Sequence, residues 1–243
     1  MFDCHCHLLP GIDDGSRSVD MSLEMLTGSM AQGVRSVIFT PHFYADMDSP
    51  ETFLRRRAES LKRLEDGIRA KSLEDKIPEY ILGAEVHYFR GMSRSQALED
   101  LTIGGSSYIL IEMPFRNWQP QMVDEIMEIS RVLGLSVIIA HIERYLDQDR
   151  KLVKRLIEDP DILIQSNAEF FIEHRTTRKA LKMLTKGQID LLGSDSHNMT
   201  GRAPNLGEAV EIIKAGKAES QLGRIYANGV RIFSSATSEV GDY

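Results

Sequence analysis

Residues 1–15, MFDCHCHLLPGIDDG, contain the pattern on which the expected fold depends. A short apolar strand there carries Asp3, His5 and His7, and a Pro-Gly turn follows before Asp14. Alternate side chains of a strand share a face, so the two histidines should point one way and the intervening cysteines the other, toward covering helices. Two imidazoles on one face can bind one metal ion. Whether they do depends on what the rest of the chain brings to the same place.

The composition is that of an ordinary globular protein, with 42% hydrophobic and 27% charged residues among 243. This length fits one α/β barrel or two small domains, and the net charge of −7 argues against a nucleic-acid partner. No apolar run approaches the ~20 residues of a membrane span, and no leader pattern opens the chain. We therefore expect a cytoplasmic protein without direct membrane insertion. Cys4 and Cys6 are too close on one strand to pair, and we interpret them as reduced thiols; a thiolate metal pair is the less favoured alternative.

Strand-like runs alternate with helix-like runs along the whole chain. The runs are rich in Val, Ile, Leu and Phe, as is typical of parallel strands covered by helices. The predicted strands are Met1–His7, Ser36–Thr40, Tyr80–Glu85, Tyr108–Glu112, Ser136–His141, Ile162–Asn167 and Asp190–Asp195. Apolar residues recur at helical spacing between them, and the last clear helical stripe runs from Leu206 to Ile213. The alternation predicts one α/β domain over residues 1–233 with a parallel sheet, closed or open. Residues 234–243 are small and polar and should form a flexible tail.

Polar side chains, most of them His, Asp or Glu, gather where these strands end. The residues at or just beyond the ends are His5, His7, His42, Glu85, Glu112, His141, Asn167, Asp195 and His197. In a closed barrel all these ends emerge on the face where active sites lie. Each residue alone has an ordinary structural explanation, but so many buried together would need positive charge, and no Lys lies among them. Metal ions supply that charge, and the number of side chains implies two or three ions.

Two arginines follow ligand-bearing strands. Arg144 lies in AHIERY, just after His141, and Arg202 lies in SDSHNMTGRAP, after His197. A guanidinium placed there can bind a phosphate with two parallel hydrogen bonds. The alternative is a surface arginine paired with a carboxylate. Clustered metal ions activate water, so phosphoester or amide hydrolysis is the chemistry that this pattern favours.

Several other chemistries are excluded by inspection. A cysteine phosphatase needs an arginine six residues after its cysteine, and those positions hold Pro10 and Ile12. The chain also has no GxxxxGK[ST] or GxGxxG loop for nucleotides and no GxSxG elbow for a serine nucleophile.

The motifs taken together resemble the PHP (polymerase and histidinol phosphatase) superfamily. They are the HxH start, the histidine after the second strand, GAEVHY, AHIERY and the late SDSH. With GIDDG, TPHF and SDSHNMTGRAP the chain is more closely similar to the manganese-dependent protein-tyrosine phosphatases of bacterial capsule and exopolysaccharide operons. The resemblance spans about Met1 to Phe233. It implies a distorted (β/α)7 barrel with a trinuclear metal site.

The resemblance also implies a role for each site residue. One metal would be held by His5, His7, Glu85 and Asp195. A second would be held by Glu112 and His141, with Glu85 bridging, and a third by Asp14, His42 and His197. Arg144 and Arg202 match the phosphate-binding arginines. Asp14 stands where several other PHP branches have a histidine, which favours the tyrosine phosphatase branch.

The resulting hypothesis is hydrolysis of phosphotyrosine by a metal-activated hydroxide, with Mn²⁺ expected and Fe, Zn, Co or Mg as alternatives. The implied substrate is the tail of a membrane-bound tyrosine autokinase that regulates polysaccharide synthesis. His42 or His197 would protonate the leaving group. Two alternatives stay open, a PHP phosphoesterase acting on a small molecule such as histidinol phosphate, and a metal-stabilised regulatory module without catalysis. His87 is expected at the rim of the site and His174 in solvent.

Overall fold

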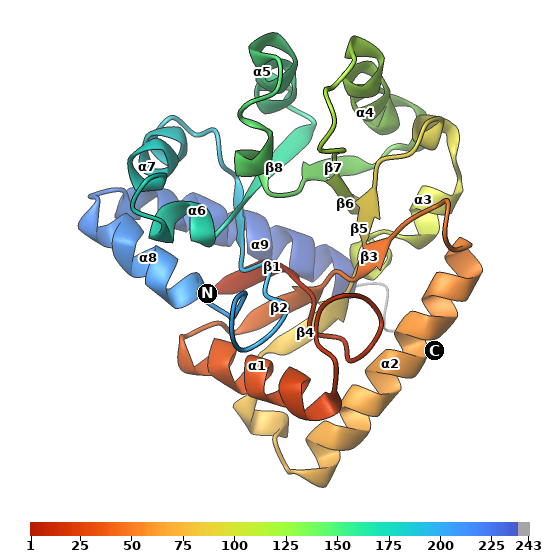
Figure 1. Cartoon of the computed structure of the whole chain (residues 1–243), viewed down its shortest axis with the longest axis vertical. Coiled ribbons are helices and arrows are strands. Elements are labelled where there is room, and N and C mark those ends of the chain that lie inside the picture. Colours follow the sequence, from red (N-terminus) through yellow and green to blue (C-terminus); the bar gives the residue numbers. More distant parts are fainter. Residues whose placement is uncertain (238–243) are drawn as a thin grey trace.

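Parallel strands curl around a common centre, and most helices lie outside them (Figure 1). The computed structural model describes residues 1–237. One sheet has the order β1-β2-β4 and the other the order β3-β5-β6-β7-β8-β9. The strands are β1 (Phe2–Cys6), β2 (Ser36–Phe39), β3 (His42–Phe43), β4 (Glu79–Leu82), β5 (Glu85–His87), β6 (Tyr108–Glu112), β7 (Ser136–Ile139), β8 (Ile162–Asn167) and β9 (Leu191–Gly193).

Two strands bend and divide between the sheets, so the predicted single strand Tyr80–Glu85 was wrong. Its two halves are β4 and β5, and β3 likewise continues the line of β2. Backbone bonds carry the ladder across the bend, because Gly83 N donates to Phe39 O (2.8 Å) and Glu85 N donates to Pro41 O (3.0 Å). With each bent pair counted once, the described chain has seven strands in the order that the (β/α)7 prediction requires.

A backbone seam joins the first strand to the last. Asp195 N donates to His5 O at 2.8 Å, and His7 N donates to Ser196 O at 2.9 Å. Cys6 and Ser196 form an isolated parallel bridge at the same place. The curled sheets therefore close where β1 lies beside the segment that follows β9.

Several of the helices that surround the strands begin or end at residues that commonly cap helices. The α-helices are α1 (Val19–Ala31), α2 (Pro50–Ala70), α3 (Ala97–Asp100), α4 (Pro120–Leu133), α5 (Arg150–Glu158), α6 (Glu169–Ile172), α7 (Thr177–Thr185), α8 (Leu206–Ala215) and α9 (Leu222–Thr237). Short 3₁₀ turns are η1 (Glu74–Lys76), η2 (Met92–Arg94), η3 (Ile103–Gly105), η4 (Ile142–Tyr145) and η5 (Glu219–Gln221). Ser18 and Ser49 cap α1 and α2 with their hydroxyls, and α4 ends at Gly134, whose φ is +70°. None of the helices within residues 1–237 has the length and apolar character needed to span a bilayer.

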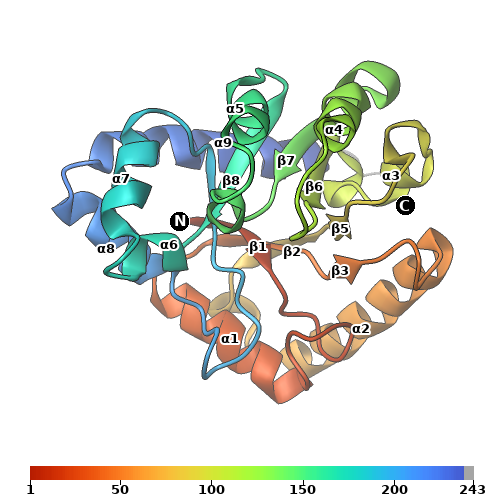
Figure 2. The same ribbon diagram turned by 45° about the horizontal axis from the view of Figure 1, so that its top comes forward.

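The last helix, α9, crosses behind the strands in both views (Figures 1 and 2) and was not predicted. Its glycines and small polar residues interrupt the apolar pattern by which a helix is recognised in sequence. Gly229 lets the helix approach β1, since a Cβ there would lie 2.4 Å from the Phe2 ring. Ala236 is fully buried. Residues 234–237, the first part of the predicted tail, continue the helix, and residues 238–243 lie outside the described part, so the tail remains a prediction there.

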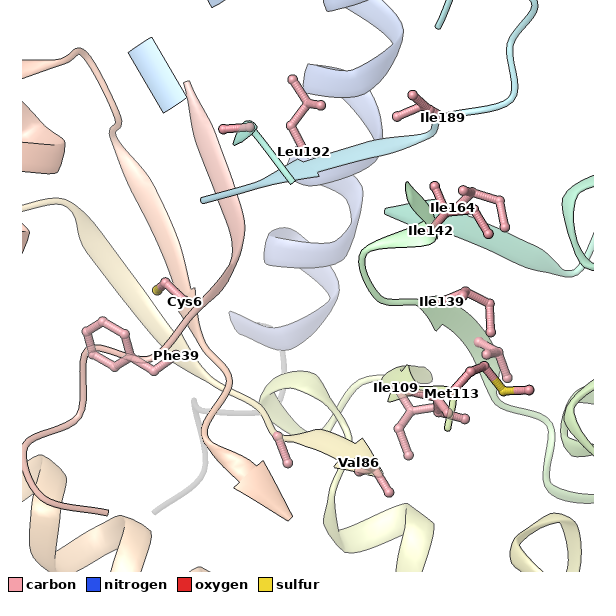
Figure 3. Packing of buried hydrophobic residues seen from close by; sticks show 14 of the residues in the cluster. Cys6, Phe39, Val86, Ile109, Met113, Ile139, Ile142, Ile164, Ile189 and Leu192 are labelled. Carbon is pink, nitrogen blue, oxygen red and sulfur yellow. The ribbon is translucent and has the colours of Figure 1, made fainter. Parts of the chain in front are cut away.

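Buried apolar side chains form two clusters. The larger lies between the strands and the surrounding helices and includes Val86, Ile109 and Ile139 (Figure 3). The smaller collects alternate strand residues such as Ile38 and Ile138 together with side chains of α9. The strands are thus packed on both sides, as expected of parallel strands.

The two cysteines lie in different clusters, Cys6 in the larger and Cys4 in the smaller. The predicted common face toward the helices was wrong because β1 shifts register against β2 between Asp3 and Cys6. The Cys4 thiol donates to Leu192 O and the Cys6 thiol to Ile38 O. Burial raises the pKa of both thiols, which favours the protonated form over a metal thiolate.

Candidate metal centre

The nine residues that the sequence suggested as metal ligands all meet at the carboxyl ends of the strands. Glu85, which begins β5 and is 1% exposed, lies at their centre. Its Oε2 atom lies 3.2 Å from His5 Nε2 and 3.3 Å from His7 Nε2. The same oxygen is 3.0 Å from His42 Nδ1, and Oε1 is 2.9 Å from His141 Nε2. Glu85 thus contacts four histidines from three strands or strand ends, as a bridging carboxylate would.

Three further carboxylates complete the cluster. Asp195 Oδ1 lies 3.5 Å from His7 Nε2. Asp14 Oδ1 lies 3.5 Å from the Nε2 atoms of both His42 and His197. On the other side, Glu112 Oε1 is 3.4 Å from His141 Nε2.

Three groups of these side chains have ligand atoms within 4.8 Å of one another and could each hold an ion. The groups are His7, Asp14, His42 and His197; His5, His7 and Asp195; and His42, Glu85 and Glu112. The first contains the third site implied by resemblance and adds His7 to it. His7 and His42 each appear in two groups, so the partition of ligands among ions stays a prediction.

Unpaired polar atoms show that the donor set suits metal ions. Glu85 Oε2, His42 Nδ1 and His197 Nε2 are buried and make no hydrogen bond within residues 1–237. His5 Nε2 and His7 Nε2 face each other at 3.1 Å. Buried polar atoms are costly when unpaired, and a cation would accept their lone pairs together. Mixed imidazole and carboxylate donors suit divalent first-row metals.

In the absence of metal, protons on histidine offset the negative charge of the carboxylates in the cluster. Burial alone would raise the pKa of Glu112, but hydrogen bonds from His141 and His87 lower it to about 2. Burial alone would lower the pKa of His141, but its bonds to Glu112 and Glu85 raise it to about 9. Protons on imidazole therefore hold the place of positive charge among the carboxylates, and bound metal ions would displace them.

Two of the proposed ligands have backbone conformations that are unusual for residues other than glycine. His141 has φ +32° and Asp195 has φ +51°. Such strain persists only where surrounding contacts enforce it, and it is concentrated at functional sites. His141 N donates to Gln165 Oε1 (2.6 Å), and Asp195 N donates to His5 O at the seam. The strain supports a functional role for both positions.

Asp13, which was not among the predicted site residues, orients two of the histidines. Its Oδ2 atom lies 2.8 Å from His7 Nδ1 and accepts a hydrogen bond from His42 N at 3.1 Å. Its Oδ1 atom accepts from Gly15 N at 2.9 Å. A metal-bound histidine usually donates its other ring nitrogen to a carboxylate or carbonyl. The aspartate that directly precedes Asp14 in IDDG was a signal for such a partner.

A chain of amides on β8 supports the opposite side of the cluster. Gln165 Oε1 lies 3.3 Å from His5 Nδ1, and Gln165 Nε2 donates to Asn167 Oδ1 at 2.9 Å. Asn167 Nδ2 in turn donates to Asp195 Oδ2 at 2.8 Å. Only Asn167 stood out in the sequence, because it ends a strand, whereas Gln165 resembled an interior strand residue.

The two histidines outside the ligand set lie where they were expected. His87 is at the rim, with Nδ1 2.8 Å from Glu112 Oε2, and it therefore orients that carboxylate. His174 is exposed at the start of the segment before α7.

Arg144 and Arg202 converge on one carboxylate oxygen. The Nη2 atom of each lies 2.6 Å from Asp195 Oδ2. Arg144 comes from η4 after β7 and Arg202 from the loop after β9, and their side chains are 36% and 38% exposed. Each has a carboxylate partner, but that partner belongs to the cluster itself. The pair therefore places two guanidiniums at the solvent side of the site.

Aromatic rings flank the mouth of the site. Phe115 is 57% exposed and stacks on His141, with centroids 6.1 Å apart and planes at 19°. Tyr44 lies 5.4 Å from His42 and 5.3 Å from His87, centroid to centroid. An exposed phenyl ring held over a ligand histidine offers a flat apolar surface to a substrate group.

Fold and site together define an α/β-barrel protein with a buried histidine and carboxylate cluster that suits metal ions and an arginine pair beside it. A family model described as "Capsular polysaccharide synthesis, CpsB/CapC" matches residues 1–234. The chain belongs to this CpsB/CapC family.

Known proteins similar to this chain are tyrosine phosphatases. It is 31% identical over 225 residues to the tyrosine-protein phosphatase CpsB of Streptococcus pneumoniae, covering 88% of this chain and 89% of the relative. It is 28% identical over 221 residues to the tyrosine-protein phosphatase YwqE of Bacillus subtilis, covering 88% and 84%. A crystal structure from work on YwqE of B. subtilis and CpsB of S. pneumoniae, described as unique metal-dependent tyrosine phosphatases, superposes with a TM-score of 0.78. That structure is 23% identical, and the match covers 97% of this chain and 95% of the other. The superposition confirms the barrel fold.

Proposed function

We propose that this protein is a metal-dependent protein-tyrosine phosphatase of capsular or extracellular polysaccharide synthesis. The observation that carries the proposal is the convergence of Arg144 and Arg202 on Asp195, at the open side of a buried histidine and carboxylate cluster. An arginine pair recognises phosphate, and the cluster supplies metal ligands beside it. Membership of the CpsB/CapC family supports the same activity.

The metal ligands that we propose are those with converging donor atoms. They are His5, His7, Asp14, His42, Glu85, Glu112, His141, Asp195 and His197. We propose Mn²⁺ as the ion, in two or three copies, because hard carboxylates and imidazoles are mixed in the set. Bound ions of this kind lower the pKa of water and stabilise the charge of a phosphoryl group in hydrolysis.

The side chains of the chain itself position the substrate. Arg144 and Arg202 bind the phosphoryl oxygens and offset the negative charge that develops on them. Phe115 offers its face to the phenyl ring of the phosphotyrosine. The leaving tyrosine oxygen, with a pKa of ~10, needs only modest help, and we assign the proton donor to whichever of His42 and His197 is not fully committed to a metal ion.

The physiological substrate that we propose is the phosphotyrosine-bearing tail of a membrane-bound bacterial tyrosine autokinase. Membership of a capsular polysaccharide synthesis family supports this choice. We place the reaction in the cytoplasm, where such a tail would be exposed.

The test compares two substrates on the full-length protein with added Mn²⁺. We expect a phosphotyrosine peptide to be hydrolysed with a kcat/KM at least tenfold above that for histidinol phosphate, together with two or three metal ions per chain by elemental analysis. Preference for histidinol phosphate would replace the proposal with a small-molecule phosphoesterase. Stoichiometric metal without hydrolysis of either substrate would favour a regulatory module.

A further inference from the structure

A basic groove lies between α5 and α7, outside the metal centre. It encloses about 430 Å³ and has apolar walls that include Val153 and Met183. Five cationic residues line it, all exposed: Arg150, Lys154, Lys179, Lys182 and Lys186. No Asp or Glu is among its lining residues in the described chain.

This charge is unbalanced locally, although the whole chain carries −7. Lys154 has one carboxylate neighbour, Glu158, at 3.5 Å. The other four cations form no ion pair with any residue in the range 1–237. Cations gathered in a concave surface raise the local potential and attract anionic groups.

The groove starts beside the catalytic face. Its lining includes Leu146 and Gln148, which follow directly after η4, the turn that carries Arg144. Figure 1 shows α5 and α7 as neighbours on the outside of β8. A polypeptide that leaves the metal centre past Arg144 can therefore enter the groove.

We propose that this groove binds an acidic segment of the same polypeptide whose phosphotyrosine occupies the metal centre. The inference rests on the proposed phosphatase function, because it takes the metal centre to be the site that binds phosphotyrosine. Each nine-residue helix is about 13 Å long, and an extended peptide advances ~3.3 Å per residue, so the groove matches about four residues. Carboxylates would face the lysines, and aliphatic parts of the segment would contact Val153 and Met183.

The shape of the surface favours a peptide over an anionic membrane. A bilayer surface is broad and nearly flat at this scale, whereas these cations line a depression between two helices. A single extended chain can enter such a depression and contact both walls.

The test uses two phosphotyrosine peptides, one with four acidic residues beside the phosphotyrosine and one with four neutral residues, at low salt. We expect the wild-type protein with Mn²⁺ to have a lower KM for the acidic peptide. In the double variant Lys179→Glu/Lys182→Glu that advantage should fall about tenfold, because two attractive pairs become repulsive. It should also shrink in wild type as salt rises, since the screening length is about 8 Å at physiological ionic strength. The matched control, Lys71→Glu/Lys76→Glu, reverses two exposed lysines near the end of α2 and should keep the wild-type preference.

A binding measurement separates this inference from the proposed function. Fluorescence anisotropy of the unphosphorylated acidic peptide should show binding to wild type and loss in Lys179→Glu/Lys182→Glu, whether or not any phosphatase activity is found. Equal preference in the wild type and the groove variant would overturn the proposal. So would groove-dependent binding to phosphatidylserine vesicles without binding of the peptide, which would assign the cations to a membrane.

Discussion

Replacing Asp13 by Asn tests whether a residue outside the ligand set holds the metal centre in shape. The Oδ2 atom of Asp13 meets two donors, the ring Nδ1 of His7 at 2.8 Å and the backbone N of His42 at 3.1 Å. In Asp13→Asn one oxygen becomes an amide N–H group, which is itself a donor. If the side-chain oxygen that remains in Asp13→Asn still accepts from Gly15 N, the new NH₂ group faces His7 Nδ1 and His42 N, and both of those hydrogen bonds are lost. If the side-chain amide is rotated by half a turn, the hydrogen bond from Gly15 N is lost instead.

The expected loss of metal affinity follows from the hydrogen bond between Asp13 and His7. A hydrogen bond to a charged group contributes about 1.5–3 kcal/mol. Removing a carboxylate that orients a metal-bound histidine typically weakens metal binding about 10- to 100-fold, which corresponds to roughly 1.4–2.8 kcal/mol. The two ranges agree, so we expect the Mn²⁺ dissociation constant of Asp13→Asn to rise by one to two orders of magnitude.

Isothermal titration with Mn²⁺, after removal of metal by chelation, measures this constant. Asp161→Asn makes the same chemical change at an exposed position away from the site and should bind as wild type does. Thermal unfolding in the presence of chelator shows whether the fold itself is weakened. An Asp13→Asn protein that folds normally and binds Mn²⁺ with unchanged affinity would refute the orienting role.

Three further perturbations address the substrate side and the titration of the cluster. Arg202→Ala should raise KM for a phosphotyrosine peptide about 10- to 100-fold, while elemental analysis should find its metal content unchanged. Arg131→Ala, on the outer face of α4, serves as the control. Loss of metal in Arg202→Ala would contradict a phosphate-binding role. Phe115→Ala should raise KM for phosphotyrosine roughly three- to tenfold but leave that for an alkyl phosphate unchanged; equal effects would remove the ring contact. In chelator-treated protein, the folded state raises the pKa of His141 to about 9, so binding of a proton there stabilises the fold. This contribution is complete below pH 6.5 and is lost as the pH rises through 9. Urea unfolding at pH 6 and 9.5 should then differ by up to about 3 kcal/mol, and an equal free energy of unfolding at both would argue against a protonated His141.

The position of the site could be predicted from sequence because barrel geometry fixes where strands end. His5, Glu112 and His141 come from strands far apart in the chain, but parallel strands deliver their carboxyl ends to one face. Residue type at strand ends was therefore enough to bring the proposed ligands together. The bend in the third strand was hidden because Tyr80 to Glu85 forms one apolar run, and only the three-dimensional pairing divides it.

The residues that support the ligands could not be placed in the same way. Whether Asp13 or Gln165 contacts a histidine depends on which ring nitrogen faces away from the cluster, and no residue spacing reports a ring orientation. The missed helix α9 has a similar cause. Its Gly229 lowers helix propensity, but the contact with Phe2 repays that cost, and the contact exists only once the barrel has formed.

The seam between β1 and β9 has a consequence for biosynthesis. The residues at positions 5 and 7 leave the ribosome well before those at 195 and 197, and the proposed centre needs both pairs. A nascent chain or a C-terminally shortened product therefore carries an incomplete ligand set, and contacts so distant in sequence form late in folding. Metal uptake would then report that the chain has been made at least as far as His197 and that its barrel has closed. The ions would link the first strand to the segment after the last one, and because they bind the folded chain alone, the stability they add would rise with the logarithm of their free concentration.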